Sequence, residues 1–180
     1  MTDEQREKIK HYRILNEYAV PGQILFTGSS LMEQFPVNEL SMSLGQNRII
    51  YNRGVGGFTT GDMLECLEEM VFGPAPARIF INIGSNDLSL GEDILERLLE
   101  NYREILKKIK KRLPMAEIFV MAYYPVNENA PEGLAALFVN RNNQTICRAN
   151  KALKVMTEEE GCHFIEVNRG LVDEGGKLNM

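Results

Sequence analysis

Residues 78–87 read RIFINIGSND, a short apolar run that ends in Gly84 and a cluster of small polar residues. Residues 23–30 read QILFTGSS and follow the same pattern, with Gly28 preceding two serines. A short, nearly continuous apolar run bounded by turn residues indicates a strand that is buried on both faces, as in a parallel sheet. Each run therefore predicts a strand that leads into a tight, polar turn.

Further elements follow outward from these two runs. Three more apolar runs predict strands at residues 48–51, 117–122 and 162–167. Apolar residues spaced three and four apart predict helices over about 3–18, 94–109 and 146–156. One more helix is expected after a cap at Thr59 or Thr60, with an apolar face made of Met63, Leu64, Leu67, Met70 and Val71. Strands that alternate with helices indicate right-handed crossovers, so we predict an α/β fold: three α/β/α layers around a five-stranded parallel sheet, of the flavodoxin-like kind.

Length and charge narrow the class of protein. The 180 residues contain no internal repeat or linker-like break, which predicts a single domain over 1–180. Residues 1–20 are expected to add a helix that either covers a sheet face or forms a homodimer interface. Twenty Lys and Arg against 25 Asp and Glu give a net charge of −5, which lacks the positive footprint of a nucleic-acid-binding protein.

Cysteine usage and hydropathy point to the protein's compartment. Cys66, Cys147 and Cys162 are odd in number and widely spaced, which argues against a disulfide framework or a zinc site. We expect reduced, buried thiols. No run approaches the roughly 20 apolar residues of a membrane span, and the N-terminus is charged, unlike a signal peptide. The sequence therefore predicts a cytoplasmic protein.

Polar turns follow three of the predicted strands, and ligands in such sheets bind beyond the carboxyl ends of the strands. In the turn after the first predicted strand, Ser30 is either a nucleophile or an ordinary helix N-cap. Gly54, Gly56 and Gly57 either let a substrate oxygen approach a backbone N–H closely or simply form a strand-to-helix loop. Asn86 either donates to a developing oxyanion or only stabilises its own turn. The coincidence of all three at one sheet edge favours an active site.

Four segments carry a family resemblance. ILFTGSSLMEQFP at 24–36, NRGVGGFTTGDML at 52–64, INIGSNDLS at 81–89 and MAYYPVNE at 121–128 resemble blocks of the SGNH/GDSL hydrolase family, in particular the platelet-activating-factor acetylhydrolase type. The resemblance implies that Ser30 is the nucleophile, because it stands where the serine of Gly-Asp-Ser-Leu stands. It also implies that Gly57 supplies an oxyanion-hole N–H and Asn86 a side-chain amide.

Further residues are expected to contact the substrate on the same resemblance: Ser29, Phe58, Asp87 and Tyr124. Two of them depart from the family pattern. Ser29 replaces the usual acidic residue, and Phe58 stands where an aspartate often follows the glycine of the second block. Tyr123, Tyr124 and residues 134–138 follow the fourth strand, where they either wall an acyl pocket or pack under a long loop.

The family's Asp-x-x-His segment has no counterpart in this sequence. His163 is expected at the start of the fifth strand, half-buried and structural, and His11 in solvent on the N-terminal helix. We weigh three explanations: a truncated or partly ordered version of a longer enzyme, a pseudoenzyme that keeps a binding pocket, or a histidine supplied by a partner chain.

The resemblance implies a GDSL-type serine esterase or lipase that cleaves small-molecule acyl or acetyl esters through a seryl acyl-enzyme. No cofactor or metal is needed by that chemistry. The alternatives are a non-catalytic pseudoenzyme and a flavodoxin-like protein that binds a phosphate or another small ligand at the turn after the first strand.

Overall fold

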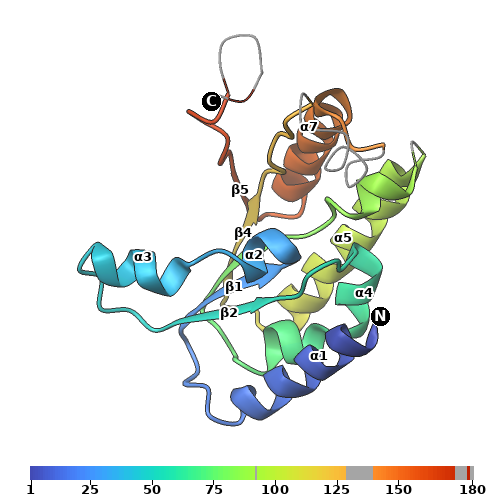
Figure 1. Ribbon diagram of the computed structural model, residues 1–180. Coiled ribbons are helices and arrows are strands. Elements are labelled where there is room, and N and C mark those ends of the chain that lie inside the picture. The colour runs from blue at the N-terminus through green and yellow to red at the C-terminus, as the bar shows by residue number, and fades with distance from the viewer. Residues whose placement is uncertain (92, 129–139, 173–177, 179–180) are drawn as a thin grey trace.

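The computed structural model describes residues 1–91, 93–128, 140–172 and 178. Within these residues, five parallel strands form one sheet in the order β2-β1-β3-β4-β5 (Figure 1). The strands are β1 at Ile24–Gly28, β2 at Ile50–Gly54, β3 at Arg78–Asn82, β4 at Glu117–Met121 and β5 at His163–Ile165. The predicted fold class is confirmed, because each strand is parallel to its neighbours and joined to the next along the chain by helices.

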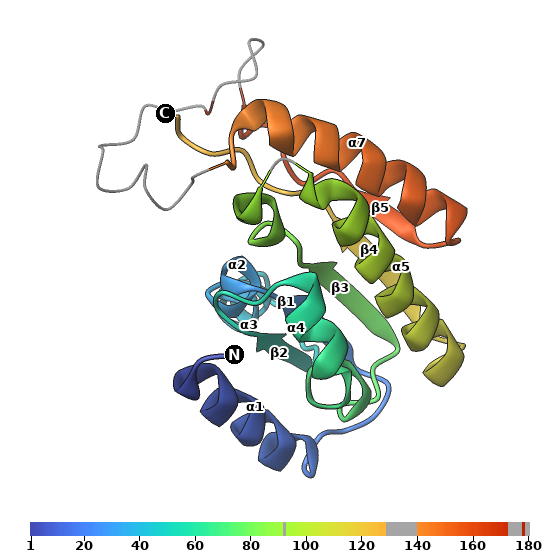
Figure 2. The same cartoon turned by 90° about the vertical axis from the view of Figure 1, so that its right-hand side faces the viewer.

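The helices leave the two sheet faces unequally covered. They are α1 at Asp3–Asn16, α2 at Ser30–Glu33, α3 at Val37–Ser43, α4 at Thr60–Glu65, α5 at Ile94–Arg112 and α7 at Asn143–Glu159, with a π-helical turn η1 at Glu68–Phe72 and a 3₁₀ turn η2 at Asp87–Leu90. Figure 2 shows α1, α4, α5 and α7 on the near side of the sheet. Helix α3 lies on the opposite side from α4 and α5 (Figure 1).

The main core lies between the sheet and the larger helical layer. Alternate strand residues such as Ile79 and Ile81 point into it and have no exposed surface. Helix α5 contributes an apolar stripe of Leu98, Tyr102, Ile105, Leu106 and Ile109. Burial of this stripe explains why the strongest helical periodicity in the sequence forms the longest helix described.

The other sheet face carries a row of stacked aromatic rings. The ring centroids of Phe26 and Phe80 are 4.7 Å apart, those of Phe80 and Phe119 are 4.8 Å apart, and those of Phe119 and His163 are 4.9 Å apart. The three phenylalanines are half-buried. These stacked rings join neighbouring strands on the sheet face that lies on the same side as α3.

Three elements differ most from the sequence-based prediction, and one of them is β5, which was expected over 162–167 and spans only His163–Ile165. We expected a strand at 48–51, but β2 runs through Ile50–Gly54 and includes Arg53, whose side chain is buried. Its guanidinium lies over the rings of Tyr12 and Tyr51, at 5.1 and 5.4 Å from their centroids. The single helix expected after Thr59 is divided into α4 and η1, although Thr59 does cap it as predicted.

Side-chain exposure corrects two more expectations. Of the three cysteines, which are all free, Cys66 is buried, Cys162 is half-buried and Cys147 is exposed. His163 is exposed rather than half-buried, because β5 lies at the edge of the sheet. Among the described helices, none is long and apolar enough to cross a membrane.

Candidate active site

The first turn brings β1 against β3 and starts helix α2. Gly28 has φ +148°, and a Cβ atom there would lie 1.9 Å from the carbonyl oxygen of Asn82, so only glycine fits. The N–H of Ser29 donates to that same carbonyl at 3.1 Å. Ser30 is then the first residue of α2 and is half-buried. The close approach of Gly28 to Asn82 on the neighbouring parallel strand therefore decides where the Ser30 side chain begins.

The second turn passes directly beneath α2. A Cβ at Gly54 would lie 2.2 Å from the backbone nitrogen of Glu33, so glycine lets the helix cross the end of β2. A Cβ at Gly56 would lie 3.9 Å from the Cβ of Ser30. Gly57 follows with φ +77°, a left-handed conformation that favours glycine, and it is exposed. Ser30 thus lies close to Gly56, the residue before Gly57.

The third turn meets the same loop from the other side. The Asn86 side chain donates from Nδ2 to the carbonyl oxygen of Phe58, at 2.8 Å. A carboxamide nitrogen carries two hydrogens, so this bond orients the amide and leaves a second N–H for another acceptor. Ser30, Gly57 and Asn86 are therefore assembled around residues 56–58, although they come from three different strand ends.

Asp87, beside Asn86, is fixed in the interior of this assembly. It is 4% exposed, and its carboxylate accepts hydrogen bonds from the backbone N–H of Thr60 at 3.0 Å and from the Thr60 hydroxyl at 2.5 Å. Burial raises the pKa of this carboxyl group, while the bonds from Thr60 act in the opposite direction. Both contacts lock the start of α4 to the third turn.

The other residues expected to contact the substrate have little free surface. Ser29 and Phe58 have none, and Phe58 packs in the hydrophobic core. The Ser29 hydroxyl is buried without a hydrogen-bond partner among the described residues. Tyr124 is half-buried, which raises the pKa of its phenol by desolvation. The apolar residues 134–138 lie outside the described residues.

Two residues of the site were not anticipated from the sequence. Glu33, on α2, accepts a hydrogen bond from the backbone N–H of Gly56 and forms an ion pair with Lys8. Gln5, on α1, donates from Nε2 to the Gly56 carbonyl oxygen at 2.7 Å. Gln5 is 51 residues from Gly56 in the chain, and it belongs to none of the recognised motifs, so no local pattern marks it.

Neither histidine stands beside Ser30 in the pattern of contacts. His163 begins β5 and pairs in register with Phe119, midway along β4. Strand β5 is an edge strand separated from β1 by β3 and β4, so His163 lies away from the turn that carries Ser30. His11 is exposed on α1. Across the described part of the chain, no group of three or more His, Cys, Asp or Glu side chains is arranged to hold a metal ion.

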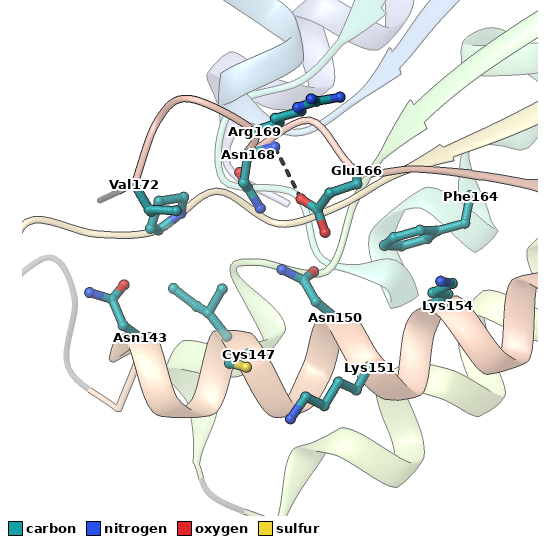
Figure 3. A pocket seen from close by; sticks show the side chains of 12 residues that line it. Asn143, Cys147, Asn150, Lys151, Lys154, Phe164, Glu166, Asn168, Arg169 and Val172 are labelled. Atoms are coloured by element: carbon teal, nitrogen blue, oxygen red, sulfur yellow. Dashed lines mark hydrogen bonds between the residues drawn. The ribbon is translucent and has the colours of Figure 1, made fainter. Parts of the chain in front are cut away.

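A separate cavity of about 440 Å³ lies between α7 and the segment that follows β5 (Figure 3). Asn143, Cys147 and Asn150 line it from α7, facing Glu166 and Asn168. The side-chain amide of Asn168 also donates to the carbonyl oxygen of Tyr123 at 2.9 Å. The cavity therefore borders the chain after β4, and its lining includes none of Ser30, Gly57 and Asn86.

The five-stranded α/β fold, with three polar turns at the carboxyl ends of its strands, agrees with the class of α/β hydrolases. Residues 26–180 match the model of the GDSL-like lipase/acylhydrolase family, and the chain belongs to that family. All three turns lie inside the matched region. No curated protein matches the chain.

Solved structures agree with this membership. A protein from Streptococcus pneumoniae, provisionally described as a platelet activating factor, is 32% identical, with a TM-score of 0.86 over 98% of this chain and 80% of its own. A GDSL-like lipase from Bacteroides thetaiotaomicron is 19% identical, with a TM-score of 0.75 over 95% of this chain and 83% of its own. The esterase EstA from Pseudoalteromonas sp., inhibited by monoethylphosphonate, is 16% identical, with a TM-score of 0.61 over 87% of each chain. The last two show similarity of fold.

Proposed function

We propose that this protein is a carboxylic ester hydrolase in which Ser30 is the nucleophile. The observation that carries the proposal is the assembly around residues 56–58: the Cβ of Ser30 lies close to Gly56, and the Asn86 amide donates to the carbonyl oxygen of Phe58. A serine hydroxyl, a backbone N–H and a side-chain amide at one edge are the groups that acyl transfer needs. Membership of an acylhydrolase family supports this chemistry over phosphate or flavin binding.

In the proposed reaction, the Ser30 Oγ adds to the ester carbonyl carbon and forms a tetrahedral intermediate. The carbonyl oxygen becomes an oxyanion that accepts hydrogen bonds from the N–H groups of Ser30 and Gly57 and from the second amide hydrogen of Asn86. Collapse of the intermediate releases the alcohol and leaves an acyl group on Ser30. Water then attacks that acyl-enzyme and releases the carboxylic acid.

The proton of Ser30 requires an acceptor for this reaction to turn over at neutral pH. The sequence has no Asp-x-x-His, and His163 lies on the edge strand β5, stacked on Phe119 and away from Ser30. A second candidate function is that the same site binds an acyl ester without turning it over, since no hydrogen bond joins Ser30 to a histidine in the described part of the chain. The two candidate functions have the same ligand, an acyl ester, and differ in the rate at which that ester is hydrolysed.

Small-molecule acyl or acetyl esters are the proposed substrates. Short acyl esters, acetylated sugars and lysophospholipid-like esters all present the carbonyl group that the three turns are proposed to bind. The phosphonate that inhibits the esterase EstA supports the choice of a phosphonate probe for this site. Tyr124 remains our proposed wall of the acyl side of the site.

The test is hydrolysis of p-nitrophenyl acetate together with labelling by a fluorophosphonate probe. We expect Ser30→Ala to abolish labelling and to lower kcat/KM by on the order of 10³-fold or more. Ser29→Ala examines the other serine of the pair and should leave labelling in place. Ser43→Ala, at the exposed end of α3, is the matched control and should behave as the wild type.

The outcomes separate the two candidates. Hydrolysis that depends on Ser30 supports the esterase. Saturable binding of a short-chain ester, with the same slow hydrolysis in the wild type and in Ser30→Ala, supports binding without turnover. Loss of labelling in Ser29→Ala but not in Ser30→Ala would identify Ser29 as the nucleophile and refute our choice of Ser30.

A further inference from the structure

Helix α1 holds the loop at Gly56 through two of its side chains. Gln5 donates from Nε2 to the Gly56 carbonyl oxygen at 2.7 Å. Lys8, three residues further along the same helix face, forms an ion pair with Glu33, and Glu33 accepts the hydrogen bond of the Gly56 N–H. Both peptide groups that flank Gly56 are therefore held from α1, one directly and one through Glu33.

The peptide between Gly56 and Gly57 gives the Gln5 contact a direction. The carbonyl oxygen of Gly56 and the N–H of Gly57 belong to one planar trans unit, so they point opposite ways. A bond that fixes the carbonyl oxygen thereby fixes the direction of the N–H. Gln5 also packs closely here, since a Cβ at Gly57 would lie 3.0 Å from its Nε2.

We propose that Gln5 is a positioning residue that aims the Gly57 N–H at the oxyanion, with Lys8 and Glu33 steadying the other side of the loop. The proposal rests on the proposed function, in which that N–H is a donor. Glycine at 57 gives the loop wide conformational freedom, so an external hydrogen bond is needed to hold one orientation. The family match begins at residue 26, so α1 lies outside the region to which that match assigns a role.

Gln5 also helps to cap the N-terminus of α1, and the test must separate this role from its hydrogen bond to Gly56. It completes a capping box, because its Oε1 accepts from the Thr2 N–H at 2.7 Å and its own N–H donates to the Thr2 hydroxyl at 3.2 Å. Gln5→Glu keeps an acceptor for this cap. It removes the donor to Gly56 and sets a carboxylate oxygen against a carbonyl oxygen.

We expect Gln5→Glu to lower kcat for p-nitrophenyl acetate by about tenfold to a hundredfold, with KM and the thermal midpoint close to wild type. The loss is smaller than the roughly 10²–10³-fold that follows removal of an oxyanion donor, because the N–H remains but is misdirected. Gln5→Met, nearly the same size and uncharged, should lower kcat similarly, which separates the lost donor from the added charge.

Thr2→Ala is the matched control. It weakens the cap and leaves the Gln5 donor in place, so kcat should stay at the wild-type value. Unchanged kcat in both Gln5 variants would overturn the proposal. An equal loss in Thr2→Ala would also overturn it, because the effect would then belong to the helix cap.

The amide NMR signal of Gly57 tests the geometry without turnover. It should shift in Gln5→Glu and in Gln5→Met, and stay in place in Thr2→Ala. If the wild-type protein shows no hydrolysis dependent on Ser30, the proposed function fails, and this signal alone decides the positioning claim. A Gly57 signal unmoved in both Gln5 variants would then refute it.

Discussion

Glycines set the geometry of the site at the residue scale because other atoms of the protein occupy the space where their side chains would be. A Cβ at Gly28 would meet the Asn82 carbonyl, one at Gly54 would meet Glu33, and one at Gly84 would lie 2.3 Å from the Tyr123 hydroxyl. Each of these close approaches lies at or just beyond the end of a strand. The three turns can therefore come together only because these positions carry no side chain.

Gly28→Ala tests this view through stability. The alanine would be strained at φ +148°, and its Cβ would displace the Asn82 carbonyl, so we expect a loss of about 3–5 kcal/mol in the free energy of unfolding. Gly161→Ala is the matched control, because Gly161 also has positive φ, +68°, but has open space around it. Its cost should be about 1–2 kcal/mol. Urea unfolding measures the free energy of unfolding of both variants. Equal losses would contradict a role for the close approach of Gly28 to the Asn82 carbonyl.

At the scale of elements, Asp87 joins two of them, because its carboxylate accepts hydrogen bonds from Thr60 at the start of α4 while its own residue begins η2. The Thr60 hydroxyl also accepts a hydrogen bond from Asn101 of α5, at 3.0 Å. This chain of contacts fixes the second and third turns relative to each other and to α5. It is therefore an element-level support for the site rather than a surface for substrate.

The buried Asp87 carboxyl predicts a specific dependence of stability on pH. Burial raises its pKa in the folded protein, so the folded state keeps this proton to higher pH than the unfolded chain. The corresponding stability is fully present below the ordinary pKa of aspartate and is lost as pH rises through the folded pKa. Asn at this position cannot titrate. We therefore expect the free energy of unfolding of the wild type, minus that of Asp87→Asn, to decrease as the pH rises above about 4, the ordinary pKa of aspartate.

Urea unfolding of both proteins across this pH range measures that difference. The subtraction removes the contributions of all other titrating groups, since both proteins share them. A difference that stayed constant or increased with pH would show that the hydrogen bonds from Thr60 outweigh burial at this carboxyl group.

Elements with a simple hydrophobic pattern were predictable from the sequence, and those built on long-range contacts were not. Helix α5 and strands β1, β3 and β4 follow their apolar patterns closely. Strand β2 extends through Arg53 because Tyr12, from α1, provides a partner for the buried guanidinium. No pattern in the sequence around Arg53 predicts such a partner. The prediction therefore ended the strand at the first polar residues.

The candidate site divides in the same way. Its chemical groups, Ser30, Gly57 and Asn86, lie in short motifs beside strand ends, where composition alone draws attention to them. Their supports, Gln5 and Glu33, act across 51 and 23 residues of chain. A Gln and a Glu on polar helix faces look like ordinary solvent-facing residues in a sequence. Only the folded arrangement reveals them as supports of the loop.

At the scale of the whole molecule, α1 is an integral part of the domain. Ile9 and Tyr12 belong to the main hydrophobic core, and the Tyr12 hydroxyl donates to the Gly54 carbonyl. Arg13 pairs with Glu69 of η1, a hydrogen bond and ion pair that raise the pKa of the guanidinium. These contacts spread along α1 and reach β2, η1 and the candidate site. The helix should therefore fold and unfold with the rest of the chain.

A fluorescent reporter on α1 tests this cooperativity. The chain has no tryptophan, so Leu15→Trp, at a position 41% exposed, would report on α1 alone. Far-UV circular dichroism reports on the whole molecule. We expect the two urea transitions to coincide, because core burial of Ile9 and Tyr12 couples α1 to the sheet. A tryptophan transition at clearly lower urea would show that α1 detaches first, and would leave the Gly56 loop without its support while the sheet remained folded.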